Sequence, residues 1–180
     1  MLGRERLRIG HLEQLKFLDQ VIRESLRLYP PAYVIGRRAI EDHRLAGIRI
    51  PKGAVLLVSP WTVQRSERYY ERPLEFRPER WTAEFRSSLP RFAFFPFGGG
   101  PRQCIGEGFA WMEMALVLAV LVRDWDFTLV PGQQIRPNPA MTLRSDRPIQ
   151  MNLQKVLEPG GPAEVQTGPI YPNGSPPHSS

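Results

Sequence analysis

The chain has 180 residues, of which 42% are hydrophobic and 23% charged, a composition typical of one soluble globular domain. Its net charge is +6, but the positive charge is scattered, largely on arginine, with no basic block and no interleaved aromatic residues, so nucleic acid is not an expected partner. The single cysteine excludes an intrachain disulfide.

The first predicted element is a helix over Leu12–Tyr29, where two apolar stripes recur at helical spacing and Pro30-Pro31 ends the pattern. The stripes together cover a wide arc, which is typical of a helix buried in a larger body. Short β-like runs follow at Ala32–Ile40, Leu45–Ile50 and Ala54–Ser59. The Pro51-Lys52-Gly53 turn between the last two runs predicts that they form a hairpin.

Further along the chain, one or two helical turns are predicted within Trp61–Tyr70, and an irregular, proline-punctuated segment follows as far as Pro101. A second long helix is predicted over Ile105–Arg123, and it is apolar nearly all round from Met112 onward. Three β-like pieces close the ordered part, at Asp126–Val130, Met141–Arg144 and Ile149–Leu153.

These elements predict one ordered domain over residues 1–157 and a disordered tail over residues 158–180, where Pro, Gly and Ser dominate. The longest apolar run, Met114–Val122, is shorter than the roughly 20 residues that a bilayer-spanning helix needs. Residues 1–10 carry Arg and Glu and have no apolar signal-peptide core. We therefore expect a cytoplasmic protein with no membrane segment in this chain; any anchor would lie outside it.

The residues with the clearest chemistry surround Cys104. A glycine-rich turn, Gly98-Gly99-Gly100, lets the backbone approach a flat partner because no Cβ stands in the way. Cys104 then stands at the start of the second predicted helix, where the helix dipole and free N–H groups favour a thiolate, a good ligand for a soft or borderline metal. Gly106 would let that helix lie close to the ligand plane, and Arg102 could reach an anionic group beside the metal. A lone cysteine is otherwise most often a small buried hydrophobic residue.

This stretch resembles the haem-binding loop of the cytochrome P450 family, and the matching positions are Phe97, Gly100, Arg102, Cys104 and Gly106, followed by Phe109, Ala110 and Glu113. The resemblance implies a mainly α fold with small β-sheets, of which this chain is the C-terminal portion. It implies haem b as the cofactor, with Cys104 as the axial thiolate ligand and the only metal-binding residue. Phe97, Gly98, Arg102 and Gly106 would then be cofactor-binding residues.

A second match lies on the first predicted helix. Glu24 and Arg27, in Glu-Ser-Leu-Arg, resemble the family's Glu-x-x-Arg pair, whose side chains lie one helical turn apart. An exposed pair would be worth little, but Glu24 falls on an apolar stripe, so a buried carboxylate with further partners is expected. The resemblance adds Arg80, in Pro-Glu-Arg, as the third member. It implies that this structural network fixes the core and the haem pocket rather than taking part in catalysis.

The resemblance also implies a haem propionate contact for Arg37, because Arg37, Ala39 and Asp42 resemble the family's Arg-x-Ala-x-x-Asp strand. Arg38 is the alternative, since neighbouring side chains on a strand point to opposite faces. Further on, the family often has His-Arg-Asp-Pro where this chain has Gln64-Arg65-Ser66-Glu67. The histidine is absent, and with it a possible propionate contact.

The resemblance covers Leu12–Leu153, yet it corresponds only to roughly the last third of the family's length. The helices that cover the distal haem face and carry most substrate contacts fall outside it, so no catalytic residue is assigned here. The resemblance implies a haem-thiolate monooxygenase that acts on an organic small molecule and takes electrons from a ferredoxin, flavodoxin or reductase, with this chain inactive by itself. The alternatives are a non-catalytic remnant and a small basic structural or interaction domain whose cysteine is only structural.

Overall fold

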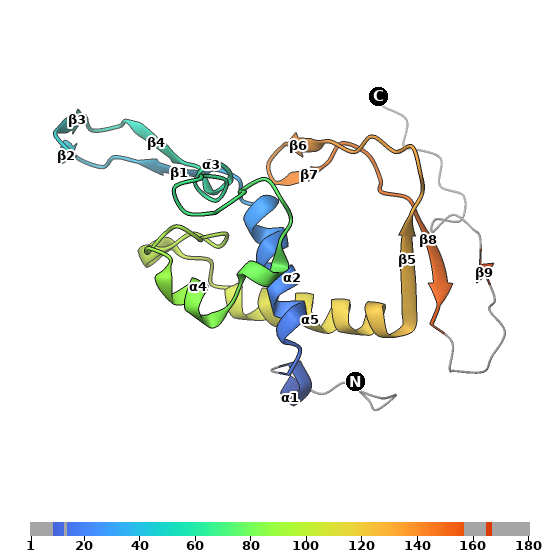
Figure 1. Cartoon of the computed structure of the whole chain (residues 1–180). Coiled ribbons are helices and arrows are strands. Elements are labelled where there is room, and N and C mark those ends of the chain that lie inside the picture. Colours follow the sequence, from blue (N-terminus) through green and yellow to red (C-terminus); the bar gives the residue numbers. More distant parts are fainter. Residues whose placement is uncertain (1–8, 13, 157–164, 167–180) are drawn as a thin grey trace, which may run out of the picture.

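A computed structural model describes residues 9–12, 14–156 and 165–166 of the chain. The helices of this part are α1 (Ile9–Leu12), α2 (Lys16–Leu28), α3 (Pro60–Val63), α4 (Ala83–Ser88) and α5 (Glu107–Asp124), with the 3-10 turns η1 (Pro78–Arg80) and η2 (Gly100–Arg102). The strands are β1 (Ile35–Arg38), β2 (His43–Leu45), β3 (Ile48–Ile50), β4 (Val55–Val58), β5 (Trp125–Leu129), β6 (Pro137–Pro139), β7 (Leu143–Ser145), β8 (Met151–Lys155) and β9 (Val165–Gln166). The strands pair antiparallel as β1–β4, β2–β3, β5–β8–β9 and β6–β7. The fold has helices and small sheets, as predicted (Figure 1).

The first predicted helix, Leu12–Tyr29, is wrong at its start. Helix α2 begins at Lys16, because Leu15 has φ −86° and ψ 55°, outside the helical region, and separates it from α1. The predicted end is right, since α2 stops at Leu28 before the proline pair. Burial also falls only on the C-terminal half of the helix, whose inward residues are Ile22, Glu24, Leu26, Arg27 and Leu28.

The predicted hairpin between Leu45–Ile50 and Ala54–Ser59 is wrong as well. The run 45–50 folds back on itself, because Ala46 and Gly47 both take positive φ, 48° and 83°, and turn β2 into β3. Strand β4 instead pairs with β1. Figure 1 shows the two hairpins in line, projecting from the body as a long arm (β1–β4 followed by β2–β3).

Two elements went unrecognised in proline-rich sequence. Helix α4 forms inside the segment predicted to be irregular, where Thr82 caps the helix by accepting a hydrogen bond from the Phe85 N–H at 3.1 Å. Strand β6 contains two prolines and still pairs with β7, since it is a short edge strand. The β6–β7 hairpin contacts the segment that follows α2 in the chain, where the Leu143 N–H donates to the Pro31 carbonyl at 2.9 Å.

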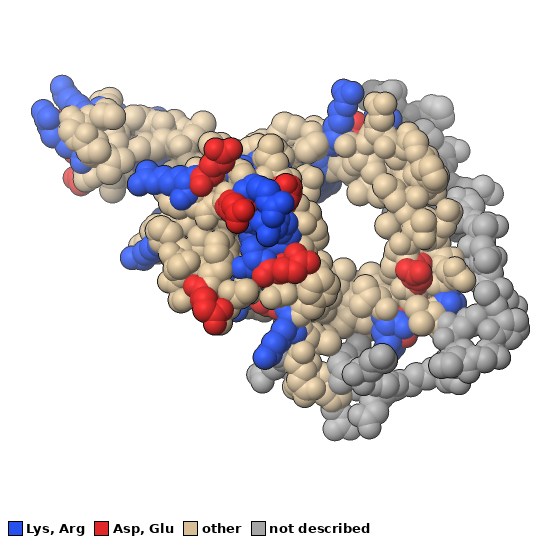
Figure 2. All heavy atoms as spheres, in the orientation of Figure 1, with Lys and Arg blue, Asp and Glu red and all other residues tan. Residues whose placement is uncertain are grey.

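Helix α5 begins at Glu107, two residues later than predicted, with Gly106 as its N-cap, and it ends at Asp124 rather than Arg123. Of its described residues only Ala119 is buried, although the helix is apolar over most of its circumference. In Figures 1 and 2, α5, β5 and the β6–β7 hairpin frame an open window beside α2. No helix among the described residues combines the length and apolar character needed to cross a bilayer.

The predicted disordered tail, residues 158–180, lies outside the described residues apart from Val165–Gln166, which pair with β8. The proposed boundary between a domain over residues 1–157 and this tail therefore stays a prediction.

Candidate functional site

The segment from Phe97 to Gly106, hereafter the cysteine loop, is a closed turn. The Cys104 N–H donates to the Phe97 carbonyl at 3.0 Å, and the Gln103 N–H donates to the Gly100 carbonyl at 3.0 Å. Gly98 and Gly100 have φ of 77° and 72°, a left-handed conformation that residues with a Cβ adopt at a cost. The glycines therefore let the chain reverse tightly enough to present Cys104 at the end of the turn.

Cys104 is exposed and lies ahead of α5 rather than on its first turn. The prediction that placed it immediately before the helix is therefore wrong by two residues. The Glu107 N–H points back to the Cys104 carbonyl at 3.4 Å, and the first helical bond runs from the Ala110 N–H to the Gly106 carbonyl. A Cβ on Gly106 would lie 3.8 Å from the Cys104 sulfur, so the glycine leaves the space beside the thiol open.

A cavity of about 410 Å³ lies next to Cys104. Five of the predicted site residues line it: Phe97, Gly98, Arg102, Cys104 and Arg37. The sixth, Gly106, lies beside the sulfur but outside the lining. The remaining wall is mostly apolar and includes Leu26, Ile35, Ala110 and Met114. Cavities of this size and character are usual for small organic ligands.

Two arginines from distant parts of the chain line the same cavity. Arg102 comes from the cysteine loop and Arg37 from β1, and no carboxylate within the described ranges pairs with either one. The Arg37 Nη1 donates only to the neighbouring Gly36 carbonyl at 2.9 Å. Arg38, the alternative to Arg37, does not line the cavity. An exposed thiol, an apolar wall and two unpaired arginines fit a flat apolar group that carries a metal and two carboxylates, as haem b does.

Glu24 is the centre of a buried charged cluster. Its two carboxylate oxygens accept hydrogen bonds from Arg27 Nε and Nη2, each at 2.8 Å, and from Arg80 Nε at 3.1 Å. The Arg77 N–H and the Trp81 indole N–H add bonds of 2.8 and 2.9 Å. The side chains of Glu24 and Arg27 are both 0% exposed. The structure thus brings Glu24, Arg27 and Arg80 together, with Trp81 as a further donor.

The surroundings of Glu24 favour its charged form. Burial by itself would raise the pKa of the carboxyl, but the hydrogen bonds from Arg27, the Arg77 backbone and Trp81 and the charge of Arg27 outweigh it and hold the pKa below its ordinary value. Arg27 is also saturated, because Nη1 donates to the carbonyls of Gln64 and Pro73 at 2.8 and 2.7 Å. A buried ion pair tolerates its desolvation only when its remaining hydrogen-bond capacity is met in this way.

Gln64 connects this cluster to the cysteine loop, and sequence reasoning missed it. Its side-chain amide donates to the carbonyls of Leu26 and Arg27, both at 3.1 Å, and its oxygen accepts from the Phe95 N–H at 2.9 Å. The Phe95 carbonyl in turn accepts from the Gly98 N–H at 2.9 Å. The sequence signal was present, since Gln64 stands where the family often has histidine. The structure shows this side chain bonded within the core rather than facing the cavity.

Among the described residues, no three His, Cys, Asp or Glu side chains gather in a group that could hold a metal ion.

The chain belongs to the cytochrome P450 family, whose sequence profile, described as Cytochrome P450, matches residues 1–153. Members of the family are haem-thiolate monooxygenases, in which a cysteine thiolate ligates the haem iron. The family generally uses redox partners and organic substrates.

Among its relatives, the chain is 36% identical over 151 residues to cyclooctatin synthase of Streptomyces melanosporofaciens, covering 84% of this chain and 33% of that protein. It is 38% identical over 142 residues to pentalenene oxygenase of Streptomyces avermitilis, covering 79% of this chain and 32% of that protein. Among solved structures, the retinoic acid-bound cyanobacterial CYP120A1 matches with a TM-score of 0.80 and 34% identity, over 87% of this chain and 36% of that one. The chain therefore spans about a third of the length of the relatives it matches.

Proposed function

We propose that this chain is the C-terminal, haem-binding part of a haem-thiolate monooxygenase and that Cys104 is the axial ligand of haem b. The observation that carries the proposal is the cavity of about 410 Å³, which collects Cys104, Arg102 and Arg37 from distant parts of the sequence. When bound, haem supplies the redox chemistry that inserts one atom of dioxygen into an organic substrate.

The chain's own residues bind and orient the group. The Cys104 sulfur projects from a turn closed by its N–H bond to Phe97, so its direction is set by the backbone. Arg102 and Arg37 would each hold a propionate through the planar guanidinium, which binds a carboxylate with two parallel hydrogen bonds. The Phe97 ring packs 6.0 Å from the Trp111 ring of α5 and closes the cavity beside the sulfur.

We further propose that the 180-residue chain by itself does not hydroxylate substrate. Of the described residues of α5 only Ala119 is buried, and within the described part of the chain α2 and α5 are the only α-helices that line the cavity beside Cys104. Positioning a substrate and excluding water would need a more complete enclosure. A ferredoxin, flavodoxin or reductase would serve as the electron donor of the longer protein. The cytoplasmic location stays a prediction.

A test of the ligand is the carbon monoxide difference spectrum of the chain loaded with haem and reduced. The unaltered chain should give the long-wavelength Soret band of thiolate-ligated haem, and Cys104→Ala should lose that band. An unchanged spectrum for Cys104→Ala would remove Cys104 from the role of ligand.

Arg102→Leu tests the propionate contact. A hydrogen bond to a charged group contributes about 1.5–3 kcal/mol, so haem retention should weaken by about tenfold to a hundredfold while the thiolate band persists in the haem that stays bound. Arg38→Leu is the matched control, because Arg38 lies next to the site in sequence and does not line the cavity. Equal haem retention in the two variants would place the propionates elsewhere.

A second candidate is a haem-binding chain with no catalytic role, and the exposure of α5 favours it. Both candidates predict no coupled turnover for the isolated chain, measured as product formed per electron consumed with a surrogate reductase. They differ for a longer protein that includes this chain, where only the first candidate predicts coupled turnover. Coupled turnover by the isolated chain would contradict both the non-catalytic candidate and our proposal that this chain is inactive alone.

A further inference from the structure

A strained turn stands directly before the cysteine loop. The Ala93 N–H donates to the Pro90 carbonyl at 3.0 Å, which closes a four-residue turn over residues 90–93. Phe92, at the third position, has a φ of +66°. Turns with positive φ at this position favour glycine, and a bulky side chain there is uncommon because its Cβ crowds the backbone. Phe92 therefore occupies its position at a conformational cost.

The turn cannot relax easily, because the buried core holds the chain just after it. The Tyr70 hydroxyl donates to the Ala93 carbonyl at 3.0 Å, and both groups are buried. Two residues further on, the Phe95 N–H donates to the buried Gln64 side chain at 2.9 Å. The backbone that follows Phe92 is thus fixed by two buried hydrogen bonds, which keep the strained conformation in place. Strain of this kind persists where the surroundings over-determine the conformation, and it often marks a functional position.

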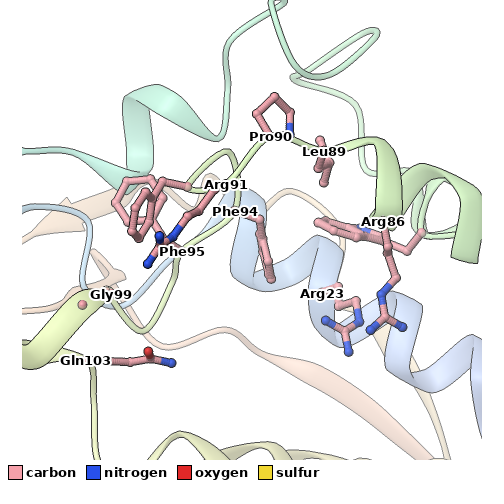
Figure 3. A pocket seen from close by; sticks show the side chains of 13 residues that line it. Arg23, Arg86, Leu89, Pro90, Arg91, Phe94, Phe95, Gly99 and Gln103 are labelled. Carbon is pink, nitrogen blue, oxygen red and sulfur yellow. The ribbon is translucent and has the colours of Figure 1, made fainter.

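The ring of Phe92 lies against the cysteine loop at Gly99. A Cβ built on Gly99 would overlap the edge of the Phe92 ring. Gly99 has a φ of −178°, an extended conformation open to any residue, so an added side chain there would meet the Phe92 ring rather than an unfavourable backbone angle. Phe92 and Gly99 line one surface pocket of about 370 Å³. Figure 3 shows Gly99 and Gln103 on the same side of it as Arg91 and Phe95, with Arg23 and Arg86 on the other side.

Burial does not account for this placement of the ring. Phe92 is 47% exposed, and its other neighbours are the Arg91 guanidinium, 4.8 Å above the ring centre, and the Phe95 ring, edge-on at 6.3 Å. A residue that only covered apolar surface would gain little here from a positive φ. What the conformation achieves is direct contact between an aromatic ring and the backbone of Gly99.

We propose that Phe92 is a positioning residue for the thiolate: the turn over residues 90–93 presses its ring on Gly99 and so restrains the cysteine loop. Gly99 lies between Gly98 and Gly100, and three consecutive residues without a Cβ leave this stretch intrinsically free to move. The restraint keeps the hydrogen bond from the Cys104 N–H to Phe97 closed and fixes the direction of the sulfur. Its consequence for ligation rests on the function proposed above for Cys104.

Amide hydrogen exchange of the 180-residue chain without haem tests the restraint. Phe92→Gly and Phe92→Ala both remove the ring, and Phe92→Tyr keeps it. The amides of Gly98, Gln103 and Cys104 should exchange about tenfold faster in the first two variants, because the loop opens more often, and unchanged in the third. Phe92→Gly should melt at a higher temperature than Phe92→Ala, because glycine relieves the backbone strain. Equal exchange in all four proteins would overturn the proposal.

A double-mutant cycle with Gly99→Ala tests the contact itself. The added methyl group should lower the melting temperature when Phe92 is present and leave it unchanged in the Phe92→Gly background, because the two groups compete for one space. Additive effects of the two substitutions would show that the ring does not press on Gly99, and would overturn the proposal.

The spectrum of the haem-loaded, reduced and CO-treated chain separates this inference from the proposed function. Phe92→Gly should shift part of the signal from the thiolate band to the band of non-thiolate haem, and Phe92→Tyr should restore it. If the unaltered chain gives no thiolate band, the proposed function fails, while the exchange data still decide whether Phe92 restrains the loop. If the unaltered chain gives the band and Phe92→Gly matches it in both spectrum and exchange, the positioning role fails alone.

Discussion

Helices α2 and α5 are both rich in apolar residues, but among the described residues α2 buries much more of its length than α5 does. Five of its 13 residues are buried, including a fully hydrogen-bonded ion pair, because the segment from Gln64 to Trp81 wraps around its C-terminal half. Helix α5 has 18 residues and buries only Ala119. Apolar composition therefore indicates that a helix will be covered, but not by which part of a protein. Substitutions of buried residues in α2 should therefore lower the stability of the chain strongly, whereas substitutions in α5 should change it little.

The strongest test of this difference is Glu24→Ala. Removing the carboxylate leaves Arg27 and Arg80 charged in a buried site without their partner, which should cost about 3–5 kcal/mol of stability. That is a large fraction of the stability of a domain, so we expect a chain that no longer unfolds cooperatively, measured by circular dichroism against temperature. The control is Glu75→Ala, which breaks the exposed pair with Arg72 and should leave the melting temperature unchanged. Similar losses in the two variants would contradict the burial of Glu24.

The same substitution in each helix sharpens the comparison. Leu28→Ala, in α2, empties a site that is 3% exposed and should cost about 2–5 kcal/mol. Leu121→Ala, in α5, changes a side chain that is 38% exposed and should alter the free energy of unfolding by less than about 1 kcal/mol. Urea unfolding of the two variants measures both values. A loss at Leu121 as large as that at Leu28 would mean that α5 is covered within this chain.

A smaller effect is expected at Gln64. Gln64→Leu leaves the Phe95 N–H and the carbonyls of Leu26 and Arg27 without their buried partner, at a cost of about 1–3 kcal/mol. Gln103→Leu is the matched control, because the Gln103 side chain is exposed and its amide donates to the Glu107 carboxylate four residues away. Urea unfolding again gives the measurement. If the two variants unfold at the same urea concentration, Gln64 does not tie α2 to the segment before the cysteine loop.

The smallest expected effect is a pH dependence. The folded-state pKa of Glu24 lies below its ordinary value of 4.5, so the carboxylate's contribution to stability is complete above that pH and is lost as the pH falls through the folded-state pKa. The melting temperature of the unaltered chain should therefore fall more steeply below pH 4.5 than that of Glu24→Gln. Parallel curves would show that another acid controls the acid unfolding.

The sequence predicts best where a motif fixes the geometry. The loop glycines and Cys104 imply a turn that presents a thiol, and the structure has that turn; Glu24, Arg27 and Arg80 do come together. The errors lie where local patterns compete. Strands β2 and β3 are separated by Ala46 and Gly47, which both have positive φ. Alanine rarely takes this conformation, so the residue type of Ala46 gave no sign of a turn. The partners of Gln64 are more than thirty residues distant, so no local pattern reveals them.

The arm formed by β1–β4 and β2–β3 is a surface through which two molecules of this chain could associate. Among the described residues each of its strands pairs along one edge and leaves the other edge open. Apolar side chains such as Ile40 and Ile48 are exposed beside these edges, an arrangement that invites strand addition from a second molecule. Arg44 and Arg49 are register partners across β2–β3, and Asp42 pairs with Arg49 at 2.8 Å. Figure 2 shows more basic than acidic side chains at this tip. Like charges of this kind repel an approaching copy, and salt screens them over about 8 Å at physiological ionic strength. The scattered arginines that give the chain its net charge would thus keep the arm from joining molecules edge to edge in dilute buffer, and self-association should increase as salt is added.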